Sequence, residues 1–199
     1  MTARRCSPCS ETTRGGREAV RCIALLRGIN VSGRKTATMT DVKRVFESLS
    51  FENVTTYAQS GNVIFECRRA EKAKVAACVE EKLHETFGFS TNVLIRTQRE
   101  LETIIENNPL IDSAGVRPDK LHVTFLSDTP DETVTSTLDI KLDQGEKFVI
   151  VDTEVYLYCP NGYARTKLNN AMFETKLKTA ATTRNWKTIN KLLVISKLS

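Results

Sequence analysis

At 199 residues and 40% hydrophobic content, the chain has room for one large domain or two small ones with a packed core. Its formal net charge is a mild +5, and no apolar run approaches the roughly 20 residues that a membrane-spanning helix needs. These values argue against a membrane protein and leave enzymes, binding proteins and interaction modules open.

The positive charge lies at the two ends of the chain. Residues 163–199 carry eight lysines and arginines against one glutamate, residues 1–21 carry five arginines against two glutamates, and residues 22–162 are acidic. A separated basic region attracts phosphates or acidic partners, although a solvated helix face is the alternative. Only Trp186 and Tyr163 could stack on bases there, so nucleic-acid binding is allowed but not required.

The cysteines point to a reducing compartment. No secretory apolar segment precedes them, and Cys22, Cys78 and Cys159 lie inside apolar runs, as buried free thiols do. We therefore expect a cytoplasmic protein. Cys6 and Cys9 have the spacing of half a zinc site, but no second pair follows, so neither a metal nor another cofactor is expected.

The first half of the chain predicts a ferredoxin-like unit. Residues 1–20 are rich in Arg, Ser, Thr and Gly and are predicted to form a disordered extension. The elements that follow have the order β-α-β-β-α-β, which defines the unit. They are a strand at 22–26, a helix at 39–49 capped by Thr38 or Thr40, strands at 54–58 and 63–67, a helix at 75–87 that ends at Gly88, and a strand at 92–96.

This order of elements brings two distant segments together. Right-handed crossovers place the strand 22–26 between the third and fourth strands of the sheet. The first two strands then run in the same direction, with the third strand antiparallel between them. We therefore expect residues 27–30, at the end of the first strand, to face residues 60–62 in the hairpin.

The second half predicts another α+β domain. A helix at 98–107, a strand at 121–126, a short helix at 130–138 and a hairpin of 148–151 with 155–158 precede a final helix. Thr182 or Thr183 is its expected cap, and the order is βαββα without a clear fourth strand. The predicted organisation is an extension at 1–20, a ferredoxin-like domain at 21–97, and a second domain at 98–199 with a basic C-terminal helix. One continuous sheet is the alternative.

Two polar motifs interrupt the apolar strands of the first half, Arg27-Gly28-Ile29-Asn30 and Gln59-Ser60-Gly61-Asn62. An arginine that continues a buried strand needs a carboxylate or a phosphate beside it. The alternative is turn chemistry, with the arginine paired to an acid of the protein. On the binding hypothesis, the predicted ligand-binding residues of this half are Arg27, Gly28, Asn30, Ser60, Gly61 and Asn62.

A phosphate loop is a weaker hypothesis for the first motif. Residues 28–36 nearly match Gly-x4-Gly-Lys-Thr, but Arg34 occupies the lysine position and makes the loop one residue too long. The insertion disrupts the backbone geometry that such a loop needs, and the repeated parallel βαβ units of these enzymes are missing. A looser anion site with Arg27, Arg34 and Lys35 is favoured.

The C-terminal region supplies three further candidates. Residues 162–168 and 182–188 offer threonine caps at helix starts beside Lys167 and Arg184, a favourable environment for an anion. Lys167, Arg184 and Asn185 are therefore predicted ligand-binding residues, with Leu168 and Trp186 assigned to packing. No catalytic residue is identified, because His84 and His122 have no nucleophile or base at a suitable spacing.

A set of short motifs spread over residues 22–195 carries a family resemblance. The motifs are Leu25-Leu26-Arg27-Gly28-Ile29-Asn30-Val31, Thr56-Tyr57, Gln59-Ser60-Gly61-Asn62-Val63, Asn108-Pro109, His122, Phe125-Leu126, Lys167-Leu168 and Thr182-Thr183-Arg184-Asn185-Trp186-Lys187-Thr188. With these motifs the chain resembles the domain of unknown function 1697 family of bacterial proteins. It departs from that pattern at Ser32-Gly33, where the family usually has Gly-Gly, and at Lys178, where it tends to have Gly. The resemblance implies an α+β fold of two ferredoxin-like βαββαβ-type halves, with mainly antiparallel sheets and helices on one face.

These observations lead to one functional hypothesis and two alternatives. We expect a cytoplasmic, cofactor-free protein that binds an anionic or phosphorylated small molecule, or nucleic acid, at the interface of its two halves. The alternatives are a hydrolase or transferase that acts on a nucleotide-like substrate, and a protein-interaction module. The sequence predicts neither the ligand nor the oligomeric state.

Overall fold

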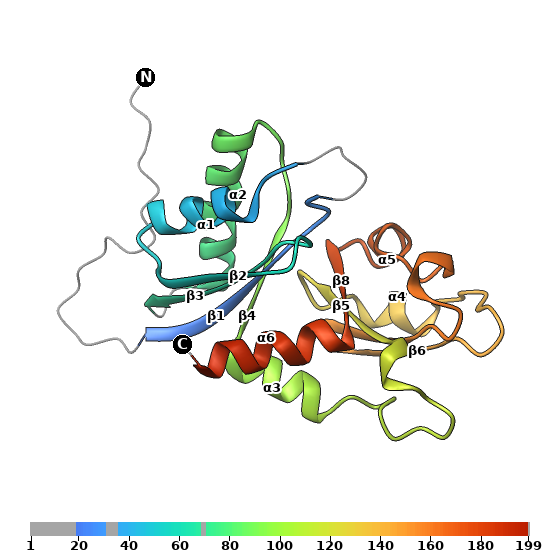
Figure 1. The fold of residues 1–199 in the computed structure, drawn as a ribbon. Helices are drawn as coiled ribbons and strands as arrows, with labels where there is room; N and C mark the ends of the chain where they lie inside the picture. The colour runs from blue at the N-terminus through green and yellow to red at the C-terminus, as the bar shows by residue number, and fades with distance from the viewer. Residues whose placement is uncertain (1–18, 31–35, 69–70, 199) are drawn as a thin grey trace. The chain divides into compact units, whose positions relative to one another are not determined.

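The protein is described here by a computed structural model that covers residues 19–30, 36–68 and 71–198 (Figure 1). It is an α+β protein with two antiparallel sheets in two similar halves, as predicted, and each sheet has four strands. One compact unit contains the described residues up to Glu100 together with residues 192–198, and the other is Leu101–Lys191. Within the described part of the chain, every helix is too short or too polar to cross a membrane.

The first unit confirms the predicted order of elements and of strands. Its sheet has the strand order β2-β3-β1-β4, with β1 antiparallel to both β3 and β4. The first strand begins at Ala19, inside the segment predicted to be disordered, and residues 1–18 lie outside the described chain. The elements are β1 (Ala19–Leu26), α1 (Met39–Ser48), β2 (Glu52–Tyr57), β3 (Asn62–Arg68), α2 (Lys72–Phe87), β4 (Val93–Thr97) and the following α3 (Gln98–Glu106).

The helix ends of this unit follow the capping signals in the sequence. Thr38 is the N-cap of α1, and its hydroxyl accepts a hydrogen bond of 3.1 Å from the amide of Asp41. Gly88 ends α2 in the left-handed conformation, with a φ of 73°. Both helices pack on one face of the sheet, where Phe46, Phe51 and Phe65 form an aromatic cluster with centroid separations of 4.7–5.9 Å.

The second unit contains a fourth strand that the sequence did not predict. Its sheet has the order β6-β7-β5-β8, and β8 occupies the position assigned to a helix cap. The actual cap of the last helix is Asn185, whose Oδ1 accepts a bond of 2.7 Å from the Thr188 amide. The elements are η1 (Pro118–Lys120), β5 (Leu121–Leu126), α4 (Glu132–Ser136), β6 (Lys147–Val151), β7 (Glu154–Tyr158), η2 (Tyr163–Arg165), α5 (Asn170–Leu177), β8 (Ala181–Asn185) and α6 (Trp186–Leu198).

The two halves repeat one pattern of backbone hydrogen bonds at the end of their first strand. In each half, the last residue of that strand bonds to the hairpin turn, and the next residue bonds to the segment before the fourth strand. The pairs of bonds are Leu26 N to Gly61 O and Leu126 N to Thr153 O, at 2.8 Å, and Arg27 N to Asn92 O and Ser127 N to Ala180 O, at 2.9 Å.

Gly61 is the residue that allows the hairpin of the first unit to lie against the end of β1. Its φ is +76°, a conformation that L side chains rarely adopt. A Cβ atom at this position would lie 2.3 Å from Cγ2 of Ile29 and 2.9 Å from Cβ of Leu26. The turn therefore requires glycine both for its conformation and for the space that the neighbouring side chains leave.

The Gly61→Ala variant tests this requirement. We expect it to lower the free energy of unfolding by about 2–4 kcal/mol, because a left-handed alanine and a steric overlap are combined. Gly88→Ala is the matched control, since Gly88 has a similar φ of +73° with nothing within 4 Å of the added Cβ, and it should cost only about 1 kcal/mol. Urea unfolding of both variants measures the difference, and equal losses would show that the turn does not pack tightly.

Candidate functional site

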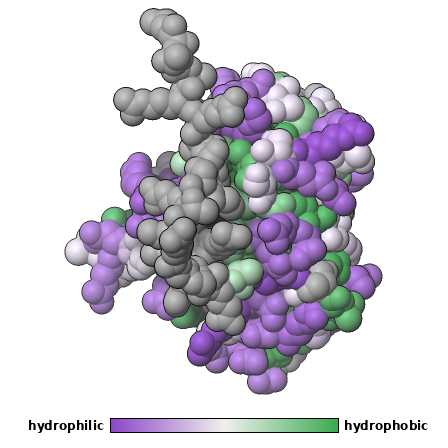
Figure 2. Space-filling view, turned by 90° about the vertical axis from the view of Figure 1, so that its left-hand side faces the viewer, coloured by the Kyte–Doolittle hydropathy of each residue, from purple (hydrophilic) through white to green (hydrophobic). Residues whose placement is uncertain are grey.

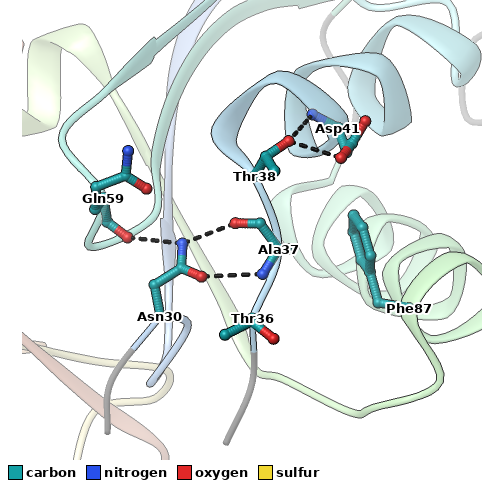
Figure 3. A pocket seen from close by; sticks show the side chains of 7 residues that line it. All are labelled: Asn30, Thr36, Ala37, Thr38, Asp41, Gln59 and Phe87. Atoms are coloured by element: carbon teal, nitrogen blue, oxygen red, sulfur yellow. Dashed lines mark hydrogen bonds between the residues drawn. The ribbon is translucent and has the colours of Figure 1, made fainter. Parts of the chain in front are cut away.

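The side-chain amide of Asn30 joins the two polar motifs of the first unit (Figure 3). Its Nδ2 donates to the carbonyl oxygens of Ala37, at 2.9 Å, and Gln59, at 3.1 Å. Its Oδ1 accepts from the amide of Ala37 at 2.9 Å. One side chain therefore links Asn30, in the first motif, to Ala37 and to the β2–β3 hairpin, which is the proximity that the strand order predicts.

Asn62 stabilises the hairpin from within. It is fully buried, and its Nδ2 donates to the Tyr57 carbonyl at 2.8 Å and to the Ser60 hydroxyl at 3.1 Å. The left-handed residues of this turn are Ala58 and Gly61. Asn62 instead begins β3, where its amide satisfies the polar groups of the turn.

The backbone of Arg27 is held by the chain that leads into β4. Its amide donates to the Asn92 carbonyl at 2.9 Å, and its carbonyl accepts from the Thr91 hydroxyl at 2.6 Å. Gly28 follows with a φ of +67° and open space around it. The Arg27 residue is partly exposed.

An open pocket of about 540 Å³ lies beside this junction (Figure 3). It combines one residue from each motif with the start of α1 and the last residue of α2, which the sequence analysis did not include. No signal along the sequence links Asp41 or Phe87 to the motifs, since only the packed helices bring them there. The lining residues are Asn30, Thr36, Ala37, Thr38, Asp41, Gln59 and Phe87.

Asp41 gives the pocket a negative charge. Its Oδ2 accepts from the Thr38 hydroxyl at 2.6 Å, and its Oδ1 accepts from Nη1 of Arg44 at 2.9 Å. These two interactions hold the pKa of the Asp41 carboxyl below its ordinary value of 3.8, so it is ionised at neutral pH. Among the described residues, no group of three or more metal-ligating side chains is present.

The three candidates of the second unit have different environments. Lys167 is exposed, with its Nζ 4.0 Å from Asp143. Arg184 is only 6% exposed, donates to Oγ1 of Thr182 at 2.8 Å, and has its pKa lowered to about 10 by burial. Asn185 caps α6 through its side chain. The side chains of Arg184 and Asn185 thus make structural contacts, and none of the three lines the pocket of the first unit.

The second unit contains a polar cluster that the sequence analysis did not predict. The rings of His122 and Tyr163 stack at 4.9 Å, and the Tyr163 hydroxyl donates to Oγ1 of Thr183 at 2.9 Å. Thr183 in turn donates to Asn170 at 2.6 Å, and its oxygen lies 2.7 Å from that of Thr124. These residues come from four elements, so their proximity depends on β8, which the sequence did not predict.

Some sequence predictions fall on segments that the structure does not describe. Arg34 and Lys35 of the phosphate-loop hypothesis lie between Asn30 and Thr36, outside the described residues. The half zinc site of Cys6 and Cys9 also lies outside them.

The fold and the comparisons define the class of this protein. Its two βαββαβ halves, each followed by a helix, form a duplicated ferredoxin-like α+β fold. The chain belongs to the DUF1697 family, described as proteins of unknown function, whose model matches residues 20–156.

A solved structure has a similar fold. This conserved bacterial protein from Streptococcus pneumoniae is 21% identical in sequence, with a TM-score of 0.70. The similarity covers 90% of this chain and 99% of that one. No curated protein matches the chain.

Replacing Asn30 by glycine tests how much the shared amide contributes. Glycine keeps the left-handed backbone, at a φ of 56°, and removes all three side-chain hydrogen bonds. We expect a loss of about 2–3 kcal/mol in the free energy of unfolding, because the polar groups of Ala37 and Gln59 lose their partner. Asn53→Gly is the control, since Asn53 has a φ of 51° and one exposed bond to Glu66, and a loss as large as that of Asn30→Gly would contradict the assignment.

His122 should make stability depend on pH. Burial lowers its pKa below the ordinary value of 6.5, so the folded protein favours the neutral ring. The stabilisation is complete above pH 6.5 and is lost as the pH falls below it, because the unfolded chain then binds more protons. Urea unfolding between about pH 7.5 and about pH 5.5 should show this loss, and His122→Gln should flatten the profile. An unchanged profile in the variant would show that other groups cause it.

Proposed function

We propose that this protein binds a small anionic ligand, of the phosphorylated class, in the pocket at the start of α1. The observation that carries this proposal is the meeting of the two polar motifs beside a pocket of about 540 Å³. That volume suits a small molecule. The hydrogen bond between Asn30 and the hairpin holds one wall of the pocket in place without a ligand.

The start of α1 is the part of the pocket suited to a negative group. The first amides of a helix have no acceptor within it, and they carry the positive end of the helix dipole. Thr38 already occupies the Asp41 amide, so the amides of Met39 and Thr40 are the donors proposed for a phosphate. Arg27, Arg34 and Lys35 make the surrounding sequence basic.

The other pocket groups suit the neutral part of such a ligand. The Asp41 carboxylate accepts hydrogen bonds from hydroxyl or amino groups, while its charge is balanced by Arg44 at 2.9 Å. Phe87 offers an apolar ring, and the side chain of Gln59 is exposed at the rim. A phosphate joined to a hydroxyl-bearing or aromatic moiety, as in a nucleotide, uses all of these groups.

The proposal also covers the cellular location of the protein and the role of Arg184. We infer the cytoplasm as the location, supported by four buried free thiols at Cys22, Cys67, Cys78 and Cys159. The burial of Arg184 favours a structural role for that residue.

A protein-interaction module is less well supported. Such a protein needs a contiguous apolar surface. Hydrophilic residues surround smaller hydrophobic areas on the face in Figure 2, and the large hydrophobic side chains that are exposed include Leu142, Val151, Val194 and Leu198. Val151 lies at the end of β6 and Leu142 precedes that strand, whereas Val194 and Leu198 lie one turn apart in α6. The exposed pair on α6 is small compared with the contiguous surface that an interaction module needs.

Titration of ¹⁵N-labelled protein with adenosine monophosphate and with adenosine tests the proposal. We expect the phosphate-bearing ligand to shift the amide signals of Met39 and Thr40, and the nucleoside to bind more weakly. Gln59→Ala should weaken binding by about 3–10-fold, because its backbone bond to Asn30 remains while its side chain is lost. Asn92→Ala is the control, since Asn92 also holds a neighbour through its carbonyl but does not line the pocket.

Three outcomes separate the alternatives. Equal binding of adenosine would contradict recognition of the anion, and a lack of shifts at the start of α1 with both ligands and with inorganic phosphate would overturn the site. A single-stranded oligonucleotide that binds with a steep dependence on salt would indicate nucleic acid instead.

A further inference from the structure

We propose that Cys22 and Cys67 form a site of reversible oxidation, in which a peroxide converts the two thiols into a disulfide between β1 and β3. The Sγ atoms lie 3.5 Å apart in the hydrophobic cluster that α1 and α2 cover. Neither residue belongs to the proposed pocket. Cys67 was not among the cysteines that the sequence predicted to be buried.

The register of the strands explains why the two thiols meet. Cys22 lies opposite Phe65, and Cys67 lies opposite Val20, so the cysteines occupy diagonal positions on adjacent strands. Side chains at such positions point to the same face of the sheet. The sulfur atoms therefore approach each other from neighbouring strands.

The two cysteines lie near the end of the sheet, where local opening of the strands would expose them to an oxidant. Both side chains are buried, with 3% and 5% exposure, so peroxide reaches them only when the structure opens locally. β1 begins three residues before Cys22 and β3 ends one residue after Cys67. The first residues of β1 are also more exposed than its centre, which favours opening at this end.

The chemistry is a balanced two-electron oxidation. In the opened state one thiol loses its proton, its thiolate attacks a peroxide oxygen and the O–O bond breaks. A sulfenic acid and hydroxide form, and the hydroxide becomes water by taking up the proton that the thiol released. The second sulfur then attacks the sulfenic sulfur and displaces hydroxide, which leaves as water after taking up the thiol proton. Two S–H groups are oxidised to one S–S bond, and hydrogen peroxide is reduced to two molecules of water.

The diagonal geometry makes the bond easy to reduce. Diagonal neighbours lie about 7–8 Å apart at Cα, somewhat beyond the usual range for a disulfide. Closure from 3.5 Å to about 2.05 Å draws the strands together, and strained disulfides have more oxidising potentials. The closed thiols resist oxidation because burial and their mutual hydrogen bond raise the pKa of Cys22.

Peptide mapping of oxidised protein tests the inference. The full chain with Cys6→Ser and Cys9→Ser is treated with equimolar hydrogen peroxide, unfolded in N-ethylmaleimide and digested with trypsin. We expect a cross-linked pair of peptides, residues 22–27 with residues 45–68, that dithiothreitol separates. Cys22→Ser and Cys67→Ser should each abolish it. Cys78→Ser is the control, because Cys78 is buried in the same cluster and its loss should leave the cross-link unchanged.

The unsubstituted Cys22–Cys67 pair also provides a test that does not depend on the folding of a variant. The same oxidation is run in guanidinium chloride, where the proximity created by the fold is lost. The folded chain should pair Cys22 with Cys67 selectively, and a share of this pair among all disulfides that is no higher in the folded chain than in the unfolded one would overturn the proposal. Full labelling of both cysteines after oxidation of the folded protein, or their conversion to sulfinic acids, would overturn it as well.

Discussion

The first unit depends on the contact between the β2–β3 turn and the end of β1. Here the Gly61 carbonyl accepts from Leu26, and the Asn30 amide bonds to both Ala37 and Gln59. The backbone leaves a buried strand at this point, so its polar groups need partners that the sheet no longer supplies. Gly61, which has no Cβ, and the side-chain amide of Asn30, with its three hydrogen bonds, supply these partners. The pocket exists because the contact fixes its wall.

The second half has the same backbone hydrogen bonds at the end of its first strand, with different side chains around them. Thr153 takes the place of Gly61. The Thr91 hydroxyl donates to the Arg27 carbonyl, whereas the Thr179 hydroxyl accepts from the Asp128 amide after β5. The repeat extends to the fourth strands, where Arg96 and Arg184 are both buried and each donates from Nη1 to the preceding carbonyl at 3.0 Å. Equal bonds at equal positions indicate that Arg184 belongs to the repeated framework of the fold.

The sequence predicted those parts of the fold that have a local signal. Apolar runs, the Thr38 cap and Gly88 located the elements of the first half, and the rule for crossovers then placed both motifs at one edge. β8 was missed because residues 181–185 contain one apolar residue, and threonine hydroxyls satisfy each other only after folding. Asp41 and Phe87 were missed as pocket residues because their place depends on helix packing.

The polar residues of the two motifs have a structural role that differs from the one their sequence context suggests. Polar residues that interrupt buried strands suggest ligands, since an unsatisfied polar group is costly. In this protein Asn30 and Asn62 satisfy backbone groups instead, and their amides are already occupied. The groups left for a ligand are those of their neighbours, such as the Gln59 side chain and the amides at the start of α1. A polar motif can therefore mark where segments of the fold meet, while its most prominent side chains bond to the backbone there.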